Sequence, residues 1–557
     1  MTRPTALLSI PFAFILSAPR AQAQTENAPS RITAQEIDAH LRFLASDLLE
    51  GRAPATRGGR IAEEYIATQL QAFGVKPGVG DSSYFQRVPI DVVKADPATI
   101  HVVASGKANA NLRFTDDVVV WPGSATDASS ARGELVFVGY GAVAPEYKWD
   151  DFKNTDVRGK VLLVLVNDPP APASEPNLFG GKAMTYYGRW TYKYEEAERR
   201  GAAGVLIVHT TGPAGYPWHV VVNSNSTEHR LLLRDPAAPA PIGVRGWITD
   251  SAATALLAQA GLNMTQLRRQ AESRDFRPVS TGITIDASMK NSLQHMSANN
   301  VVGVVRGIDP KVRDEYVAYI AHWDHLGIGP AVNGDSIYNG AKDNAVGTAG
   351  LLEIARAFSR LKTPPKRSVL FLAVTAEEQG LLGSQYYTVS PLYPLAKTAA
   401  AINMDAINVN GRTRDLTLVG YGASDLDDYA RDAAGEQGRI IRPDPEPDKG
   451  YYYRSDHFNF AKAGVPAMYA DEGTEFIGKP EGYGERVRND YTNRDYHAPS
   501  DEVTADWDLS GSREDLKLFF AVGFRVAEAA KLPEWKPGNE FRAIREKMLA
   551  KIPKPGA

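Results

Sequence analysis

The chain has 557 residues, of which 43% are hydrophobic and none is cysteine, and its formal net charge is -4. This length allows two or three domains with a large core. The small negative charge argues against electrostatic capture of nucleic acid or of an anionic membrane. The lack of cysteine excludes disulfides, thiolate ligands and a cysteine nucleophile, so any metal must be held by His, Asp and Glu.

The N-terminus has the pattern of a secretory signal peptide. Arg3 precedes an apolar run over residues 6–16, and a small-x-small site follows at residues 21–23. The apolar run is shorter than the about 20 residues that span a membrane. We expect cleavage after residue 23 and export of a soluble protein, periplasmic or secreted, without membrane attachment. The alternative is an N-terminal anchor that stays in place.

Residues 24–115 form the first part of the predicted main domain. Apolar positions recur at helical spacing between residues 33 and 73 and are interrupted by LEGRAPATRGG, which predicts two helices around a loop containing Gly and Arg. This loop, residues 51–59, either reaches toward the active rim or is a solvated connector.

Residues 116–289 differ in sequence pattern from the rest of the chain. Short β-like runs such as ELVFVGYGAV and GKVLLVLVND alternate with Gly and Pro, and residues 186–201 form one clear helix. We predict a separate β-rich domain inserted into the main domain. The main domain then resumes over residues 290–557, which end in a Pro-rich extension.

Apolar runs in the second half of the chain end at potential ligands. The runs at 316–321, 368–376 and 399–404 are typical of buried strands, and an amphipathic helix is expected at 347–361. This alternation predicts an α/β fold with a mixed, mostly parallel sheet sandwiched by helices. Ligand groups beyond the strands then share one rim, where open α/β sheets bind ligands.

Two His and three carboxylates follow these strands or lie between them, and they are the candidate metal ligands: His322, Asp343, Glu378, Asp405 and His497. With one carboxylate bridging, this set can fill two zinc sites and leave room for a shared water. That inventory fits hydrolysis by two metals about 3.5 to 4 Å apart.

Neighbouring residues supply the other roles. Asp324 can accept the second imidazole N–H of His322. Because Glu377 and Glu378 leave a strand in different directions, one can ligate while Glu377 serves as general base and acid. Each residue alone also has an ordinary explanation, as a polar strand end, a surface charge or a turn residue. The combination at successive strand ends favours a site.

Six motifs in this order resemble the di-zinc aminopeptidase family of clan MH, whose relatives include glutamate carboxypeptidase II, the transferrin receptor ectodomain and glutaminyl cyclases. The motifs are HWDHLG, KDNAVGTAGLLEIARAF, AVTAEEQGLLGS, NMDAIN, RSDHFNFAKAGVPA and YHAPSDE. The N-terminal stretch and the middle region look like the version of the family with a protease-associated (PA) domain insert.

The resemblance implies a zinc exopeptidase fold and two Zn²⁺ per chain, held by the five candidate ligands, with Asp343 bridging both ions. Whether His322 shares its ion with Glu378 or with Asp405 stays open. The resemblance also implies Glu377 as the catalytic acid/base and a cis peptide bond after Asp343.

The RSDHF segment looks like part of the substrate pocket wall. The candidate substrate-binding residues there are Tyr452, Tyr453, Arg454 and His457, and we expect Tyr452 or Tyr453 to stabilise the tetrahedral oxyanion. His325 and His457 are not ligand positions in the family pattern.

The leading hypothesis is an exported zinc aminopeptidase that acts on peptides. A carboxypeptidase or dipeptidase on the same scaffold is the alternative, and it would need Arg or Lys groups, such as Arg454, to bind a substrate carboxylate. A non-catalytic, receptor-like binding protein predicts lost ligands, and none is lost. Acyl transfer as in glutaminyl cyclases is less favoured, because those relatives generally lack the insert. The insert either covers the active site or serves stability or oligomerisation.

Overall fold

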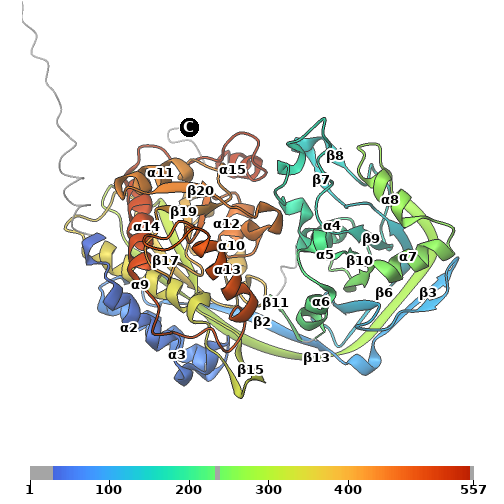
Figure 1. Ribbon diagram of the computed structural model, residues 1–557, viewed down its shortest axis with the longest axis horizontal. Coiled ribbons are helices and arrows are strands. Elements are labelled where there is room, and N and C mark those ends of the chain that lie inside the picture. The colour runs from blue at the N-terminus through green and yellow to red at the C-terminus, as the bar shows by residue number, and fades with distance from the viewer. Residues whose placement is uncertain (1–28, 227, 233–238, 552–557) are drawn as a thin grey trace, which may run out of the picture.

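The computed structural model describes residues 29–226, 228–232 and 239–551. The predicted signal peptide lies outside these residues. The chain forms two lobes joined by the long strand β13 (Val279–Val305), which runs from one lobe into the other (Figure 1). No helix within the described ranges is long and apolar enough to cross a lipid bilayer.

A mixed sheet with a parallel centre organises the first lobe. Strand β14 (Tyr316–His322) pairs in parallel with β17 (Ser368–Val374) and β18 (Thr398–Asn403), and β18 pairs in parallel with β21 (Ala467–Asp471). Antiparallel pairings add β13, β2 (Phe85–Ala95) and β11 (Glu228–Leu232) on one side and β19 (Asp415–Val419) on the other. Strand β20 (Ile440–Pro443) pairs in parallel with β19. The predicted α/β fold with a mixed, mostly parallel sheet is confirmed.

Strand β14 is buried on both faces, which explains its continuous apolar sequence. Val317, Tyr319 and Ala321 enter one core, whereas Ala318 and Ile320 enter the opposite one. Helices cover both faces of this sheet (Figure 1). The first face carries α2 (Ala34–Leu44), α3 (Arg57–Ala72), α9 (Val346–Ser359) and α14 (Ser510–Glu528), and the second carries α10 (Leu382–Val389) and α12 (His457–Lys462).

The second lobe has its own mixed sheet. Its parallel centre runs in the order β6 (Ala128–Phe137), β9 (Val161–Leu165), β10 (Gly204–His209) and β12 (Val244–Thr249). Strands β3 (His101–Gly106) and β5 (Val118–Pro122) and the first half of β13 extend it. Its helices include α4 (Trp190–Arg199), α7 (Asp250–Gln259) and α8 (Met264–Ala271).

The sheets divide the chain differently from the expected boundaries at 116 and 289. Strand β3 precedes residue 116 yet pairs within the second lobe, and residue 289 lies inside β13. Strand β11, from the middle region, pairs with β2 of the first lobe. A strand that changes sheets without a turn leaves no boundary signal in the sequence.

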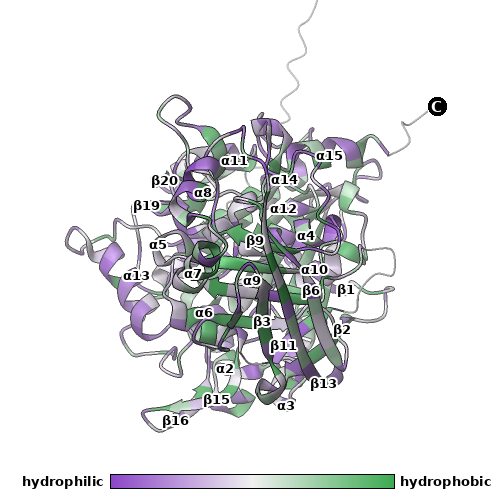
Figure 2. Cartoon of the chain, turned by 90° about the vertical axis from the view of Figure 1, so that its right-hand side faces the viewer, coloured by the Kyte–Doolittle hydropathy of each residue, from purple (hydrophilic) through white to green (hydrophobic). Residues whose placement is uncertain are grey.

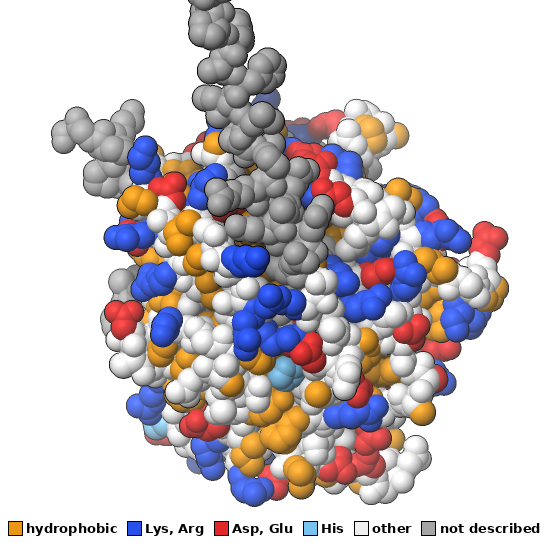
Figure 3. Space-filling model, turned by 90° about the vertical axis from the view of Figure 1, so that its left-hand side faces the viewer, with side chains coloured by type: hydrophobic (Ala, Val, Ile, Leu, Met, Phe, Trp, Pro, Cys, Tyr) orange, Lys and Arg blue, Asp and Glu red, His pale blue; other side chains and the backbone are white. Residues whose placement is uncertain are grey.

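The remaining elements are short or peripheral. The strands are β1 (Lys76–Pro77), β4 (Ala110–Asn111), β7 (Val143–Ala144), β8 (Trp149–Asp150), β15 (Gly327–Val332) and β16 (Asp335–Tyr338). The helices are α5 (Thr211–Ala214), α6 (Trp218–Asn225), α11 (Leu426–Glu436), α13 (Tyr483–Arg494) and α15 (Arg542–Leu549). Hydrophilic residues dominate outer helices such as α13 (Figure 2), and one face of the molecule mixes acidic with basic side chains (Figure 3).

The two lobes meet at an aromatic cluster beside the C-terminal extension. The Tyr186 ring of the second lobe packs against Phe458 and Tyr453 of the first, with centroids 5.0 and 6.2 Å apart. Glu540 accepts hydrogen bonds from the Tyr453 hydroxyl at 2.8 Å and from the Tyr186 backbone N–H at 3.3 Å. This carboxyl therefore contacts both lobes, and burial raises its pKa to about 8.

The raised pKa of Glu540 predicts a pH-dependent stability. Between about pH 4.3, the usual pKa of Glu, and about pH 8, the unfolded chain releases the Glu540 proton while the folded chain keeps it. The free energy of unfolding therefore falls as pH rises through this window. In Glu540→Gln the side chain stays neutral, so we expect the variant to gain stability over the wild type as pH rises.

Melting temperatures of both proteins at the two ends of this window test the prediction. Glu534→Gln, an exposed position in the same extension, is the control. The same stability difference between Glu540→Gln and wild type at both pH values would contradict a raised pKa.

Candidate metal centre

The central strands of the first lobe end at one level and bring their following residues together. His322 is the last residue of β14 and stands beside Val374, the last residue of β17. Asn403 ends β18 beside Ile320, and Asp405 follows two residues later. The sequence prediction that these ligand groups share a rim agrees with this register.

Asp343 reaches the same rim from the turn before α9. It lies in the segment Ala341–Ala345, and the peptide bond between Asp343 and Asn344 is cis, as the family resemblance implies. The Asn344 side chain donates to the Met404 carbonyl at 2.9 Å and accepts from the Gly347 N–H at 3.0 Å. Asn344 therefore ties the start of α9 to the end of β18.

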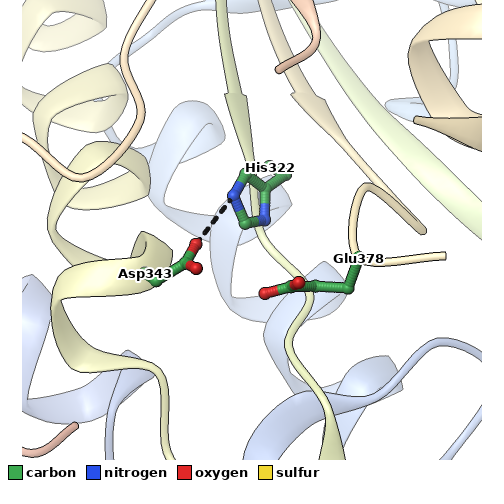
Figure 4. A group of neighbouring side chains, drawn as sticks. All are labelled: His322, Asp343 and Glu378. Carbon is green, nitrogen blue, oxygen red and sulfur yellow. Dashed lines mark ion pairs between the residues drawn. The ribbon is translucent and has the colours of Figure 1, made fainter. Parts of the chain in front are cut away.

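Two imidazole nitrogens face the carboxylates in two separate groups. His322 Nε2 lies 3.2 Å from Asp343 Oδ1 and 3.2 Å from Asp405 Oδ1. His497 Nε2 lies 3.3 Å from Asp343 Oδ2 and 3.0 Å from Glu378 Oε2. Asp343 thus presents one oxygen to each group, and His322 belongs with Asp405. Figure 4 shows His322, Asp343 and Glu378 pointing toward one another.

The donor set fits divalent cations. Ligand atoms of His322, Asp343 and Glu378 lie within 4.8 Å of one another, as do those of His322, Glu377 and Asp405. His497 Nε2 and Glu378 Oε1 are buried atoms without a hydrogen bond. Each nevertheless lies close to an ionisable group of opposite charge, His497 to the Glu378 carboxylate and Glu378 to the His325 ring. Imidazole nitrogen and carboxylate oxygen in this ratio suit zinc and related ions.

The electrostatics of the centre also favour cations. Burial lowers the pKa of His322, but the carboxylates of Glu377 and Asp405 outweigh burial and raise this pKa well above its usual value. Burial also lowers the pKa of His497, but the neighbouring carboxylates of Glu378 and Asp343 outweigh burial and raise this pKa well above its usual value. A site that draws protons onto two imidazoles has surplus negative charge, which metal ions neutralise when they replace those protons.

Glu377 and Asp324 lie beside the two groups. Burial raises the pKa of the Glu377 carboxyl well above its usual range, and the charge of Glu378 raises it further. Asp324 Oδ1 accepts the Glu377 backbone N–H at 3.2 Å. His322 Nδ1 lies 3.2 Å from the Asp324 carbonyl but 4.0 Å from its carboxylate. The expected contact with His322 is therefore made by the backbone of Asp324, because its side chain turns toward Glu377.

Residues 300–521 match peptidase family M28. We call residues 300–521 the M28 region. The earlier resemblance to the di-zinc aminopeptidases of clan MH is confirmed. The M28 region contains the three central strands, all five candidate ligands and Glu377.

Relatives of the chain include aminopeptidase NAALADL1 of Mus musculus, 36% identical over 130 residues that cover 22% of this chain and 16% of the relative. A second is the "Probable glutamate carboxypeptidase AMP1" of Arabidopsis thaliana, 25% identical over 379 residues that cover 61% and 47%. The chain thus spans less than half the length of these relatives. The structure of an aminopeptidase from Aneurinibacillus sp. strain AM-1 shares the fold, with a TM-score of 0.50, 18% identity and coverage of 92% and 98%.

The expected pocket-wall residues of the M28 region differ in accessibility. His457 is fully buried between the rings of Tyr452 and Tyr469, and burial lowers its pKa to about 3. The Tyr453 hydroxyl is bound to Glu540, and the Tyr452 hydroxyl is buried without a partner among the described residues. Arg454 is partly exposed and donates to the Lys449 carbonyl at 2.6 Å.

Three residues near the centre had no assigned role in the sequence analysis. The half-exposed Tyr496 stacks on His497 with centroids 3.9 Å apart. His325 Nδ1 lies 2.5 Å from Glu378 Oε1. Asp501 accepts the backbone N–H groups of Lys342 and Asp343 at 2.9 and 3.1 Å. All three lie in motifs quoted above, but their directions depend on backbone geometry that the motifs do not specify.

The double contact of Asp343 predicts a distinctive pattern of metal loss. We expect Asp343→Ala to bind no metal, because both groups lose a ligand. Asp405→Ala and Glu378→Ala each remove a ligand from one group, and we expect each to retain one ion. Metal content of the dialysed proteins by elemental analysis measures this.

Asp427→Ala, which removes a buried carboxylate on α11, is the control and should keep the wild-type metal content. Two tightly bound ions in Asp343→Ala would rule out the shared role of this carboxylate.

Proposed function

We propose that the protein is an exported, zinc-dependent aminopeptidase that removes N-terminal residues from peptides. The observation that carries this proposal is the pair of imidazole–carboxylate groups that share Asp343 within the M28 region. The N-terminal signal pattern supports export to the periplasm or the medium.

The proposed centre holds two Zn²⁺ ions. His322 and Asp405 would hold one ion, His497 and Glu378 would hold the other, and Asp343 would offer one carboxylate oxygen to each, as the interatomic distances support. When bound, such a pair supplies Lewis acidity that activates water and polarises the scissile carbonyl.

The chain's own residues move the protons and hold the substrate. Glu377, whose backbone N–H is held by Asp324, takes a proton from the attacking water and delivers it to the departing amine. Tyr496 stands beside His497 with its phenol protonated, since desolvation and the charges of Asp343 and Glu378 raise its pKa well above the usual value. We assign the oxyanion hydrogen bond to Tyr496 in place of Tyr452 or Tyr453, whose hydroxyls are buried or engaged.

We assign the second lobe to the PA-like insert that the sequence predicts. Its contacts through Tyr186 and Glu540 hold it against the first lobe beside the RSDHF segment. In this position it limits the size of the substrates that reach the centre.

A carboxypeptidase is the second candidate, and two arginines favour it. The Nε atoms of Arg189, in the second lobe, and Arg454, in the first, are buried without a hydrogen bond, and neither side chain pairs with a carboxylate of the described residues. Burial and then the charge of Arg454 lower the pKa of Arg189 to about 10. Two neighbouring guanidinium groups without a counter-ion suit a substrate carboxylate.

A matched set of peptides distinguishes the two candidates. One peptide is assayed with free ends, with an acetylated N-terminus, and with an amidated C-terminus, each with and without a chelator. The proposal predicts chelator-sensitive cleavage that requires the free amine and tolerates the amide. Cleavage that requires the free carboxylate would assign a carboxypeptidase, and bound metal without any cleavage would contradict both.

We expect Glu377→Gln to separate catalysis from metal binding. The amide cannot accept the water proton, so kcat should fall by about three orders of magnitude, while metal content stays at two ions per chain. Glu353→Gln, which removes a buried carboxylate that faces Arg356, is the control for loss of charge. Loss of metal in Glu377→Gln, with metal retained in Glu378→Gln, would reverse the two roles.

A further inference from the structure

The guanidinium of Arg52 contacts two of the chain segments that carry ligands to the proposed centre, those of His322 and Asp343. Arg52 is 1% exposed. Its Nε donates to the carbonyl of Trp323, next to His322, at 2.7 Å. Its Nη2 donates to the carbonyl of Gly340, three residues before Asp343, at 2.6 Å, and Nη1 also donates to Asn339. A further bond at 3.0 Å reaches Leu44 at the end of α2.

A buried anion completes the contacts on the other side of the Asp343 segment. Asp501 accepts the N–H groups of Lys342 and Asp343, and its backbone carbonyl accepts that of Ala341 at 2.9 Å. The carbonyls of residues 339 and 340 thus face a cation, and the next three N–H groups face an anionic residue. These five peptide groups each have a partner of opposite polarity, which restrains the backbone that positions Asp343.

The backbone around Arg52 is built to bury this side chain. Glu50, Gly51 and Arg52 all have positive φ, at 51°, 67° and 39°. A Cβ at Gly51 would lie 2.5 Å from the Tyr338 carbonyl oxygen, so only glycine fits there. Three consecutive residues in the left-handed region raise the conformational energy of the backbone, which an ordinary connector does not need. This backbone path directs the Arg52 guanidinium into the protein.

Arg52 also supplies charge. Burial lowers its pKa to about 10, whereas Asp324 and Asp501 raise it, so the side chain stays charged at neutral pH. The charge is held by four carbonyl oxygens and is not neutralised by a direct ion pair with any carboxylate of the described chain. It therefore remains available to offset the surplus negative charge of the rim.

We propose that Arg52 is a positioning residue of the metal centre, holding the segments of His322 and Asp343 in the geometry that binds metal. The inference rests on the proposed function, because it requires that the centre binds metal. The loop of residues 51–59 then contributes to metal binding through Arg52, whereas other buried arginines only support the fold.

Arg545 provides a matched control. It is 4% exposed, burial lowers its pKa to about 10, and it donates to the Leu395 and Thr398 carbonyls at 3.0 and 2.9 Å. Its bonds join α15 to Leu395 and to Thr398, the first residue of β18, at the opposite end of that strand from Asp405. A purely structural role for Arg52 predicts that both positions respond alike.

The test compares Arg52→Met, Arg52→Lys and Arg545→Met for Zn²⁺ affinity, by competition with a chelator, and for the melting temperature of the metal-free protein. We expect Arg52→Met to lose about tenfold in affinity, the scale seen when supporting hydrogen bonds around a metal site are removed, and Arg545→Met to keep the wild-type affinity. Arg52→Lys keeps the charge but not the fork of donors, so it should bind metal less tightly than wild type.

Wild-type affinity in Arg52→Met, or an equal loss in Arg545→Met, would overturn the inference. If Arg52→Met does not fold, Arg52→Lys decides, and wild-type affinity in that variant contradicts positioning by the fork. A wild-type protein that binds no Zn²⁺ would instead refute the proposed function, so the two failures are distinguishable.

Discussion

The parallel pairing of β17, β14 and β18 is the constraint on which the rest of the structure depends. Because these strands are in register, His322, the Glu377–Glu378 pair and Asp405 leave the sheet at one level. Both faces of the strands are buried, so a shift in register would place ligand groups in an apolar core. Helix α9 then needs only a short turn to bring Asp343 between the two imidazoles.

This concentration of carboxylates has an electrostatic cost that the fold offsets locally. Asp324, Glu377, Glu378 and Asp405 lie beside one rim with little access to water, and burial raises the pKa of Asp324 to about 7. The buried cation of Arg52 and the two imidazoles offset part of this charge. The proposed metal ions offset the remainder, which links metal binding to the stability of the rim. The second lobe contacts the first through Tyr186 and Glu540, and all five proposed ligands lie in the first lobe.

The sequence predicted the parts of this structure that follow from local pattern. Continuous apolar runs identified the buried strands, and polar residues at their ends identified the rim. Pattern could not reveal that β13 serves both sheets, since no turn marks the change. Nor could it reveal that Asp324 uses its carbonyl toward His322, or that Arg52 turns inward, because those directions depend on φ angles and long-range packing. Tyr496 was missed for the same reason, although it stands next to His497.

The central claim is that one carboxylate, Asp343, joins two metal ions at this rim. The most direct measurement is anomalous scattering at the zinc edge from crystals grown with Zn²⁺. The account predicts two peaks, one within bonding distance of His322 and Asp405 and one of His497 and Glu378, with Asp343 contacting both. A single peak, or two peaks of which only one contacts Asp343, would contradict it.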